Sequence, residues 1–574
     1  MIFVQGIAAS PGIVIGKAYF IVDHELSIDD QQIASGEVKQ EIERLYQALD
    51  KVKEELQEIK NYIARELGQE KARIFKAHIM LLNDPELLSA VEEKIKTKHI
   101  KAEKAVDEVI GHYVNLFISM QDEYLQGRKT DVRDVGDRII KELIDQKDSS
   151  GKMEEEGIVV ARDLTPADTA QLDRSVVKAF VTEQGSRTSH SAIMARSLGV
   201  PAVVGLGEEL REKCHSGDTL IVDGTEGQVI VNPDPEVLEE YKNKAAHYEE
   251  SQEDLLVYRD RKAQTKEGKR IEVVGNIGEP GDVDSVLDQG GEGIGLFRTE
   301  FLYMNRQELP TEEEQFEVYR DVAQKMGDKP VVIRTLDIGG GKNLPYFELE
   351  EEKNPFLGFR AIRISLEKKE IFIEQLKAIL RASNFGNIKI MYPMISSLEE
   401  LKAVKQLFAR ACRELENSGQ EFNPDLETGI MIEIPSTLMI ADELAAEVDF
   451  FSIGTNDLIQ YILAVDRNNE KIAEMHTPYH PAVLRFIKQI VDRAHENDIW
   501  IGMCGEAAGD ELLLPYLLGI GLDELSMSAI SILKIKQLLS KWETKEAQQV
   551  AEKVVQMKTE KEIKTFLEQC KGDM

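Results

Sequence analysis

The chain has 574 residues, of which 42% are hydrophobic and 30% charged, and its formal net charge is −34. Its length predicts roughly three or four domains, and its composition is that of a folded globular protein rather than a disordered one. The strongly acidic balance argues against DNA, RNA and anionic lipid as partners, because all three repel a negative surface.

Cysteine usage and the first residues bear on the cell compartment. The four cysteines lie far apart and form no CxxC pair, which predicts neither a disulfide framework nor a zinc site. The N-terminus lacks the basic and apolar regions of a secretory signal, and no apolar run reaches membrane-spanning length. The sequence therefore predicts a cytoplasmic protein.

The first part of the chain combines a short glycine-rich segment with a long helical stretch. Residues 2–20 contain short runs typical of strands. From Val38 onward, apolar residues recur at alternating steps of three and four, which predicts a long amphipathic helix. The apolar residues of this seam are Ile42, Leu45, Leu49, Val52, Leu56, Ile59 and Ile63. Helical patterning continues to about Asp148, with breaks expected near Asp84-Pro85 and Gly127. We expect a helical bundle that serves either as a docking surface or as structural support.

A small α/β domain is predicted after the helical stretch. Its strands are expected at 157–160, 177–181 and 202–204, and a hairpin around Asp223-Gly224 joins two further strands. We expect the glycine-rich N-terminal segment to complete this domain, which makes the helical stretch an insertion at a surface loop.

The rest of the chain alternates short apolar strands with amphipathic helices. Residues 233–268 are charged and helix-like, and they predict a helical linker that ends at Gly268. The strands expected beyond it are 271–275, 293–297, 331–335, 388–392, 429–434, 450–453, 500–503 and 524–527. About eight such units predict a TIM-type (β/α)8 barrel, with a doubly wound open sheet as the alternative.

Polar side chains follow the expected barrel strands, at the end where a barrel of this type holds its active site. These residues are Arg298, Arg334, Asp337, Lys342, Arg360, Glu433, Asn456, Asp457, Cys504 and Glu506. Arginine forks match phosphate oxygens, so the cations favour a phosphorylated ligand. Glu433 and Asp457 suit Mg²⁺, which is often held by one or two carboxylates together with substrate oxygens. Any single arginine could instead form a surface ion pair, and Cys504 could be a small buried hydrophobe.

The most specific segment of the chain, 185–196, carries His190. Thr188 and Ser189 are good helix-capping residues, which would place His190 in the first turn, where backbone N–H groups favour phosphate. An unprotonated imidazole nitrogen is a good nucleophile near neutral pH. The alternative is that His190 only caps a helix. His476 and His480 lie in a proline-containing loop and are interpreted as structural.

Two segments resemble a known family. The run Gly-Ser-Arg-Thr-Ser-His190 resembles the phosphohistidine motif of enzyme I of the bacterial phosphoenolpyruvate-dependent sugar phosphotransferase system. The run from Asp449 to Leu458 resembles the second signature of that family. The likeness extends over essentially the whole chain. One departure is Gln184-Gly185-Ser186, where many members have a glycine pair before the arginine.

The resemblance implies a domain plan. Residues 1–20 and 149–232 would form the phosphohistidine α/β domain, and 21–148 the helical insertion that docks the histidine phosphocarrier protein HPr. Residues 233–268 would be the linker. Residues 269–574 would form the phosphoenolpyruvate-binding barrel, through which family members form homodimers.

The resemblance also implies site roles and a reaction. His190 would be phosphorylated on Nε2 by phosphoenolpyruvate and would pass the phosphoryl group to HPr, the first general step of sugar phosphotransfer. Cys504 would protonate the enolate to give pyruvate. Glu433 and Asp457 would hold Mg²⁺. The substrate-binding residues would be Arg298, Arg334, Asn456, Arg467, Lys342 and Arg360.

Three other functions remain open at this point. A pyruvate phosphate dikinase or phosphoenolpyruvate synthase would need a large ATP-binding domain, for which the sequence before the histidine domain shows no glycine-rich nucleotide loop. A non-catalytic scaffold would be expected to lose His190, Cys504 or the arginines. A Mg²⁺-dependent barrel lyase would carry the histidine domain as a passenger and would survive loss of His190.

Overall fold

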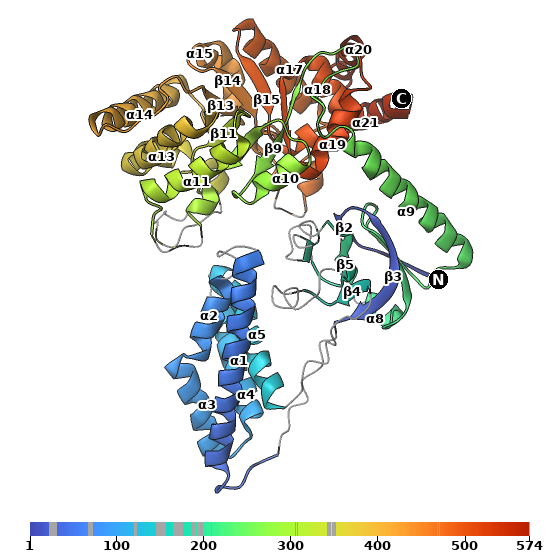
Figure 1. The fold of residues 1–574 in the computed structure, drawn as a ribbon, viewed down its shortest axis with the longest axis vertical. Coiled ribbons are helices and arrows are strands. Elements are labelled where there is room, and N and C mark those ends of the chain that lie inside the picture. Colours follow the sequence, from blue (N-terminus) through green and yellow to red (C-terminus); the bar gives the residue numbers. More distant parts are fainter. Residues whose placement is uncertain are drawn as a thin grey trace. The chain divides into compact units, whose positions relative to one another are not determined.

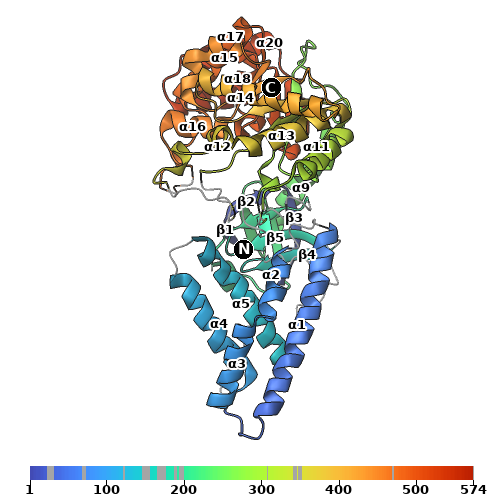
Figure 2. The same cartoon turned by 90° about the vertical axis from the view of Figure 1, so that its left-hand side faces the viewer.

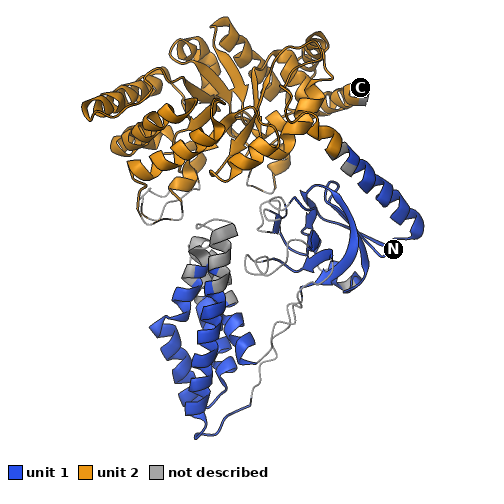
Figure 3. Ribbon diagram, in the orientation of Figure 1, with its two compact units in different colours: residues 1–251 blue, residues 252–574 orange. Residues whose placement is uncertain are grey.

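A computed structural model gives the structure of the chain. It describes residues 1–21, 31–66, 73–119, 123–144, 156–164, 176–185, 191–192, 195, 199–207, 209–304, 306, 308–340, 346, 352–467, 469 and 471–572. The chain divides into two compact units, residues 1–251 and 252–574 (Figure 3). No helix among the described residues is long and apolar enough to cross a membrane.

A bundle of helices follows the first strands (Figure 2). Its helices are α1 (Val38–Glu66), α2 (Arg73–Leu82), α3 (Pro85–Lys98), α4 (Ala102–Ser119) and α5 (Glu123–Leu143). Most of the described side chains of the predicted seam of α1 are buried: Leu45, Val52 and Leu56 are at most 1% exposed, whereas Ile42 is partly buried. These side chains pack with buried residues of α3, α4 and α5 in one apolar core, so the periodicity correctly located the buried face.

One of the two predicted helix breaks is confirmed and the other is wrong. Asp84 caps α3, because its side chain accepts from the backbone N–H groups of Glu86 and Leu87, and Pro85 occupies the first helical position. Gly127 instead lies within α5. A glycine inside a helix costs only about 1 kcal/mol relative to alanine, so it does not by itself end a helix.

The second element of residues 1–251 is a mixed sheet of eight strands (Figure 1). Its strands are β1 (Ile2–Gln5), β2 (Ile7–Ser10), β3 (Ile13–Phe20), β4 (Gly157–Ala161), β5 (Val177–Thr182), β6 (Ala202–Val204), β7 (Thr219–Asp223) and β8 (Gln228–Val231), with the short helix α8 (Glu209–Lys213) before β7. The order across the sheet is β1-β8-β7-β3-β4-β5-β6-β2. The N-terminal strands therefore complete the α/β domain, as predicted.

The hairpin and the insertion also follow the predicted pattern, with one difference. β7 and β8 pair antiparallel as far as Asp223 and Gln228, so their loop is longer than a two-residue Asp-Gly turn. Asp223 shapes this loop by accepting from the backbone N–H groups of Thr225 and Glu226. The helical bundle enters the chain between β3 and β4, which are adjacent and parallel.

The helix expected in the linker is shorter than predicted. α9 (Pro235–Leu256) begins in the first unit and ends well before Gly268. The chain beyond it belongs to the second unit, where Lys536 Nζ donates to the carbonyl oxygens of Arg259 (3.2 Å) and Gly290 (2.9 Å). Packing against the barrel replaces helical hydrogen bonds there, which charge patterning could not reveal.

Residues 252–574 form a closed barrel of eight parallel strands, which confirms the TIM-type fold over the open sheet. The strands are β9 (Glu272–Ile277), β10 (Ile294–Arg298), β11 (Val331–Arg334), β12 (Ile388–Tyr392), β13 (Thr428–Ile432), β14 (Phe450–Ile453), β15 (Trp500–Met503) and β16 (Glu524–Met527). The helices are α10 (Asp282–Asp288), α11 (Glu312–Met326), α12 (Ile362–Glu367), α13 (Lys369–Ala382), α14 (Leu398–Asn417), α15 (Ala441–Ala445), α16 (Thr455–Leu463), α17 (Pro481–Glu496), α18 (Leu514–Ile520), α19 (Ala529–Leu539), α20 (Thr544–Val554) and α21 (Glu560–Gly572). One large apolar core joins the strands to these helices, and a smaller one contains Leu296, Val332, Met391, Met431, Phe450 and Cys504.

Candidate active site

The predicted barrel residues lie at the carboxyl ends of their strands. Arg298 and Arg334 are the last residues of β10 and β11, and Glu433 and Cys504 directly follow β13 and β15. Parallel strands in a closed barrel end at one rim, so these four side chains share the mouth. The first turn of α16, after β14, adds Asn456 and Asp457, and Arg360 precedes α12.

Two buried arginines share one buried carboxylate at the centre of the mouth. Arg334 Nη1 lies 3.1 Å from Asp337 Oδ2, and Arg360 Nη2 lies 2.9 Å from Asp337 Oδ1. Arg334 also pairs with Glu300 (2.5 Å), and Arg360 with Asp457 (3.3 Å). Burial alone would lower the pKa of both arginines, but the neighbouring carboxylates raise it overall. Both guanidinium groups therefore stay charged.

Glu433 is a buried carboxyl group beside other carboxylates. Its Oε1 accepts from the backbone N–H of Met394 at 2.6 Å. Burial, followed by the negative charges of Asp457 and Asp337, raises its pKa to about 8, against the opposite effect of Arg334 and Arg360. A cation between Glu433 and Asp457 would relieve this repulsion.

Several buried polar atoms of the mouth have no hydrogen-bond partner among the described residues, among them Asp457 Oδ1, Arg334 Nε and Arg360 Nε. Such atoms are uncommon in folded proteins and often mark a place for a ligand, ion or water. The carboxylate oxygen suits a cation, and the guanidinium nitrogens suit an anion. The described residues contain no cluster of three or more His, Cys, Asp or Glu side chains placed to hold a metal, so substrate oxygens and water would complete the shell of an ion on Glu433 and Asp457.

Cys504 presents a buried thiol beneath these charges. Its Sγ lies 3.7 Å from the carbonyl oxygen of Ile453. Burial raises the pKa of Cys504 to about 11, so the group is a thiol and not a thiolate at neutral pH. It can therefore donate a proton to a strong carbon base.

The remaining barrel residues differ in their placement. Arg298 is exposed. Partial desolvation, then the charge of Arg334, lowers its pKa. Asn456 Nδ2 donates to Glu506 (3.4 Å) and its Oδ1 accepts from the Glu506 backbone (3.3 Å). Arg467 lies beyond α16 with an exposed side chain, outside the ion-pair network of the described residues.

Two predicted residues, His190 and Lys342, lie outside the described residues. The chain before His190 is described: Thr182 Oγ1 donates to the carbonyl oxygen of Gln184 at 2.6 Å. Gly185 follows with φ of 122°, a conformation that a side chain would strain. This glycine therefore sets the path into the histidine segment.

Sequence reasoning missed two residues of the mouth. Glu300, the partner of Arg334, lies in a short 3-10 turn after β10 rather than at a strand end. Asn276 donates to the carbonyl oxygen of Cys504 at 3.0 Å, and the predicted strand stopped one residue before it. Scanning three residues past each predicted strand end would have found both. Asp337 was among the predicted residues, but the sequence did not indicate that two arginines would share it as a counterion.

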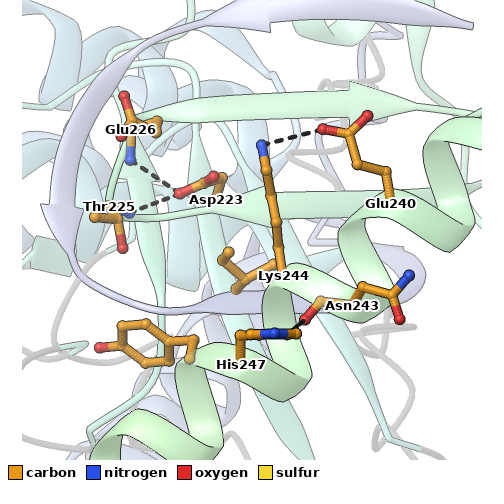
Figure 4. Close-up of a pocket in the computed structure, with 9 residues that line it drawn as sticks. Asp223, Thr225, Glu226, Glu240, Asn243, Lys244 and His247 are labelled. Carbon is orange, nitrogen blue, oxygen red and sulfur yellow. Dashed lines mark hydrogen bonds and ion pairs between the residues drawn. The ribbon is translucent and has the colours of Figure 1, made fainter.

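A separate hollow of about 600 Å³ lies in residues 1–251, between the β7–β8 loop and α9 (Figure 4). Its polar groups already interact with one another: Asp223 accepts from the loop backbone, and Lys244 lies 3.4 Å from Glu240. His247 Nδ1 lies 2.8 Å from the carbonyl oxygen of Asn243. We assign no ligand to this hollow.

Three family models match successive parts of the chain. Residues 5–128 match the N-terminal domain of PEP-utilising enzymes, 153–227 match their mobile domain, and 252–544 match their PEP-binding domain. A phosphoenolpyruvate-protein phosphotransferase of Bacillus subtilis is 49% identical over 98% of this chain and 99% of its own length.

The chain belongs to the phosphoenolpyruvate-protein phosphotransferase family. The relative of the same description from Staphylococcus carnosus is 46% identical over 99% of this chain and 98% of its own. A solution structure of Enzyme I is 47% identical and covers 43% of this chain and 99% of its own, with a TM-score of 0.38. The resemblance inferred from the sequence is confirmed, and the chain is an enzyme that transfers phosphoryl groups from phosphoenolpyruvate.

Proposed function

We propose that the chain transfers the phosphoryl group of phosphoenolpyruvate to Nε2 of His190 and then to a histidine of HPr, as the first general step of sugar phosphotransfer in the cytoplasm. The observation that carries this proposal is the mouth of the barrel, where buried arginines, paired carboxylates and a protonated thiol converge. This set matches the three needs of the reaction, which are an anion site, a cation site and an acid.

The arginines fit a phosphorylated carboxylic acid. Arg298 is exposed at the rim, and Arg334 and Arg360 each retain an unpartnered Nε. Phosphoryl transfer needs mainly positioning and charge neutralisation from the protein. We assign the binding of phosphoenolpyruvate to these three residues, with Asn456, Lys342 and Arg467 as further contacts.

Glu433 and Asp457 are the residues we assign to Mg²⁺. The raised pKa of Glu433 and the unpartnered Oδ1 of Asp457 both fit a cation held between them. When bound, the ion would neutralise charge on the phosphoryl and enolate oxygens. The protein's own contribution is to hold the two carboxylates fixed through Met394 and Arg360.

Cys504 supplies the acid in this proposal. The P–O bond of phosphoenolpyruvate breaks as the N–P bond to His190 forms, which leaves the enolate of pyruvate. The thiol donates its proton to the methylene carbon of the enolate, and pyruvate leaves. The pKa of about 11 keeps the thiol protonated until the enolate forms.

The second transfer requires the histidine domain to leave the barrel and meet HPr. We assign HPr docking to the helical insertion, dimerisation to the barrel, and the swing between the two stations to the segment around α9. Crosslinking the histidine domain away from the barrel should abolish phosphorylation by phosphoenolpyruvate, and full activity in the crosslinked protein would refute the swing.

The first test is intact-mass analysis of the protein incubated with phosphoenolpyruvate and Mg²⁺. The wild type should gain one acid-labile phosphoryl group, and His190→Ala should gain none. His215→Ala is a matched control, because His215 is an exposed histidine of the same domain (80% exposed side chain). Sustained pyruvate release should require HPr.

The same experiment tests the alternative of a barrel lyase. If His190→Ala releases pyruvate as fast as the wild type and no adduct forms in either protein, the chemistry lies wholly in the barrel and the proposed histidine step is wrong.

A further inference from the structure

A second acid lies inside the barrel, where the proposed reaction has not used it. Glu524, on β16, is 3% exposed, and its Oε1 has no hydrogen-bond partner among the described residues. A buried polar atom without a partner is costly, and proteins retain such groups chiefly where they serve a function.

Two glycines make room for this carboxyl group. A Cβ on Gly295 of β10 would lie 2.6 Å from Glu524 Oε1, and a Cβ on Gly502 of β15 would lie 2.9 Å from the same atom. Both distances are too short for real contacts. The carboxyl group therefore occupies space left open by one glycine on the adjacent strand β15 and another on β10, two strands away from β16.

Strand register places Glu524 next to the residues around the thiol. Gly502 pairs with Glu524 on one side and with Ser452 on the other. Cys504 directly follows β15, two residues beyond Gly502, and it belongs to the small interior core that also contains Leu296, the residue after Gly295. Burial raises the pKa of Cys504. The Ser452 side chain lowers this pKa, and the negative charge of Glu524 raises it. Ser452 and Glu524 thus flank the gap at Gly502, and the thiol follows two residues further along the chain.

The order of acidities favours proton transfer toward Cys504. Burial is the main cause that raises the pKa of Glu524 to about 8, and the negative charges of Glu272 and Asp523 add to it. The positive charge of Lys389 acts in the opposite direction. The pKa of Cys504 is about 11. A carboxylic acid of the lower pKa gives its proton readily to the thiolate.

We propose that Glu524 returns to Cys504 the proton that the thiol gives to the enolate. This inference rests on the proposed role of Cys504. After pyruvate forms, the Cys504 thiolate takes the proton of the Glu524 carboxyl group across the space at Gly502, and the Glu524 carboxylate then regains a proton from water. Glu524 acts through Cys504 and does not touch the substrate.

The test follows exchange of the pyruvate methyl hydrogens for deuterium in D₂O by mass spectrometry, with Mg²⁺ present. Each exchange requires Cys504 to lose a proton and regain a deuteron. Glu524→Gln should slow this exchange by at least about tenfold, since proton transfer by a positioned side chain contributes ~10²-fold or more. One round of His190 phosphorylation should keep its rate, because the first proton is already on the thiol. Glu370→Gln, which changes an exposed carboxylate paired with Arg410, is the control and should exchange like the wild type.

The pH dependence gives a second measurement that needs no variant. Exchange by the wild type should rise as the pH rises through about 8, because the resting Cys504 thiol must give its proton to the Glu524 carboxylate before it can take a proton from the methyl group, and Glu524→Gln should lack this rise. Cys504→Ala separates the two levels of the argument. If Cys504→Ala exchanges normally, the proposed role of Cys504 is wrong. If Cys504→Ala is inactive but Glu524→Gln exchanges as fast as the wild type, the proposed relay is wrong. A wild-type exchange rate that is flat through pH 8 would also contradict the relay.

Discussion

Both ends of the barrel carry charged side chains among buried groups, but the two ends differ in how many of these polar atoms have a hydrogen-bond partner. At the amino-terminal ends of the strands, Glu427 accepts from Lys389 (2.7 Å) and from Trp500 Nε1 (3.1 Å). Lys389 also lies over the Trp500 ring, which stacks on Phe450 with ring centres 4.4 Å apart. At the mouth, Asp457 Oδ1 and two arginine Nε atoms have no partner among the described residues.

This difference separates stability from chemistry. A cluster whose members satisfy one another holds strands together and has nothing left to offer a ligand. The mouth accepts repulsion between carboxylates and unpartnered donors, which is a cost to folding that a bound anion and cation would remove. Matched substitutions at the two ends, which either remove a charge or keep it and alter the hydrogen-bond geometry, therefore test the comparison.

The largest expected effect comes from removing one carboxylate charge at the mouth. Asp457→Asn should reduce phosphoenolpyruvate-dependent phosphorylation by roughly 10³-fold, because charge stabilisation of this kind is worth about that factor. Folding stability should hold or rise, since repulsion with Glu433 is relieved. Initial rates with HPr, together with thermal unfolding of the metal-free protein, measure both effects.

Glu427→Gln is the matched change at the other end of the barrel. It should leave the phosphorylation rate unchanged and lower the unfolding free energy by about 1 kcal/mol or less, as for a partly exposed ion pair. If Glu427→Gln impaired the phosphorylation rate as strongly as Asp457→Asn, the division between the two ends would not hold.

A smaller effect is expected from Arg334→Lys, which keeps the charge and loses the fork. Arg334 contacts Glu300 and Asp337 with different nitrogens, and lysine cannot reproduce both contacts and also bind an anion. We expect a loss of ~10²-fold in kcat/KM for phosphoenolpyruvate. Arg381→Lys serves as the control, because Arg381 makes a similar double pair with Glu312 and Glu313 outside the mouth, and its kcat/KM should not change.

The smallest effect is a slope of stability with pH. The pKa of Glu433 is raised from 4.5 to about 8, so the folded state binds more protons than the unfolded state between these values. The contribution of Glu433 to the stability of the metal-free protein should therefore be greatest below about pH 4.5 and should decline as the pH rises toward 8.

Mg²⁺ and Glu433→Gln should each flatten this slope, as measured by denaturant unfolding at a series of pH values. Glu524, whose pKa is also raised to about 8, contributes a slope of the same sign that Mg²⁺ should leave in place. A metal-free slope that Mg²⁺ does not alter would contradict the assignment of Glu433 to the cation.

Much of the barrel was predictable because its strands are short, buried and followed by polar residues. β12, β14, β15 and β16 have the predicted bounds, and the residues after them supplied Asp457 and Cys504. Glu433 follows β13, whose predicted strand ran two residues further. Such patterns are visible in one sequence because burial on both faces demands continuous apolar runs.

The missed features depend on contacts that sequence distance conceals. Glu300 matters because it reaches Arg334 on the neighbouring strand, and Asn276 because it reaches the Cys504 carbonyl across the barrel wall. Glu524 was inside a predicted strand, but its isolation follows only from two glycines on other strands. The end of α9 was set by packing rather than by composition.

The position of the helical bundle has a consequence for how such enzymes can diversify. β3 and β4 are parallel neighbours, with Ala18 paired to Ile158 and Phe20 to Val160, so any chain between them must return along the sheet, a task that a single helix usually performs. The whole bundle occupies that crossover. A substitute of any size whose ends meet the same two strands would leave the sheet pairing intact, so this position can be refitted during evolution or by design without rebuilding the domain that carries it.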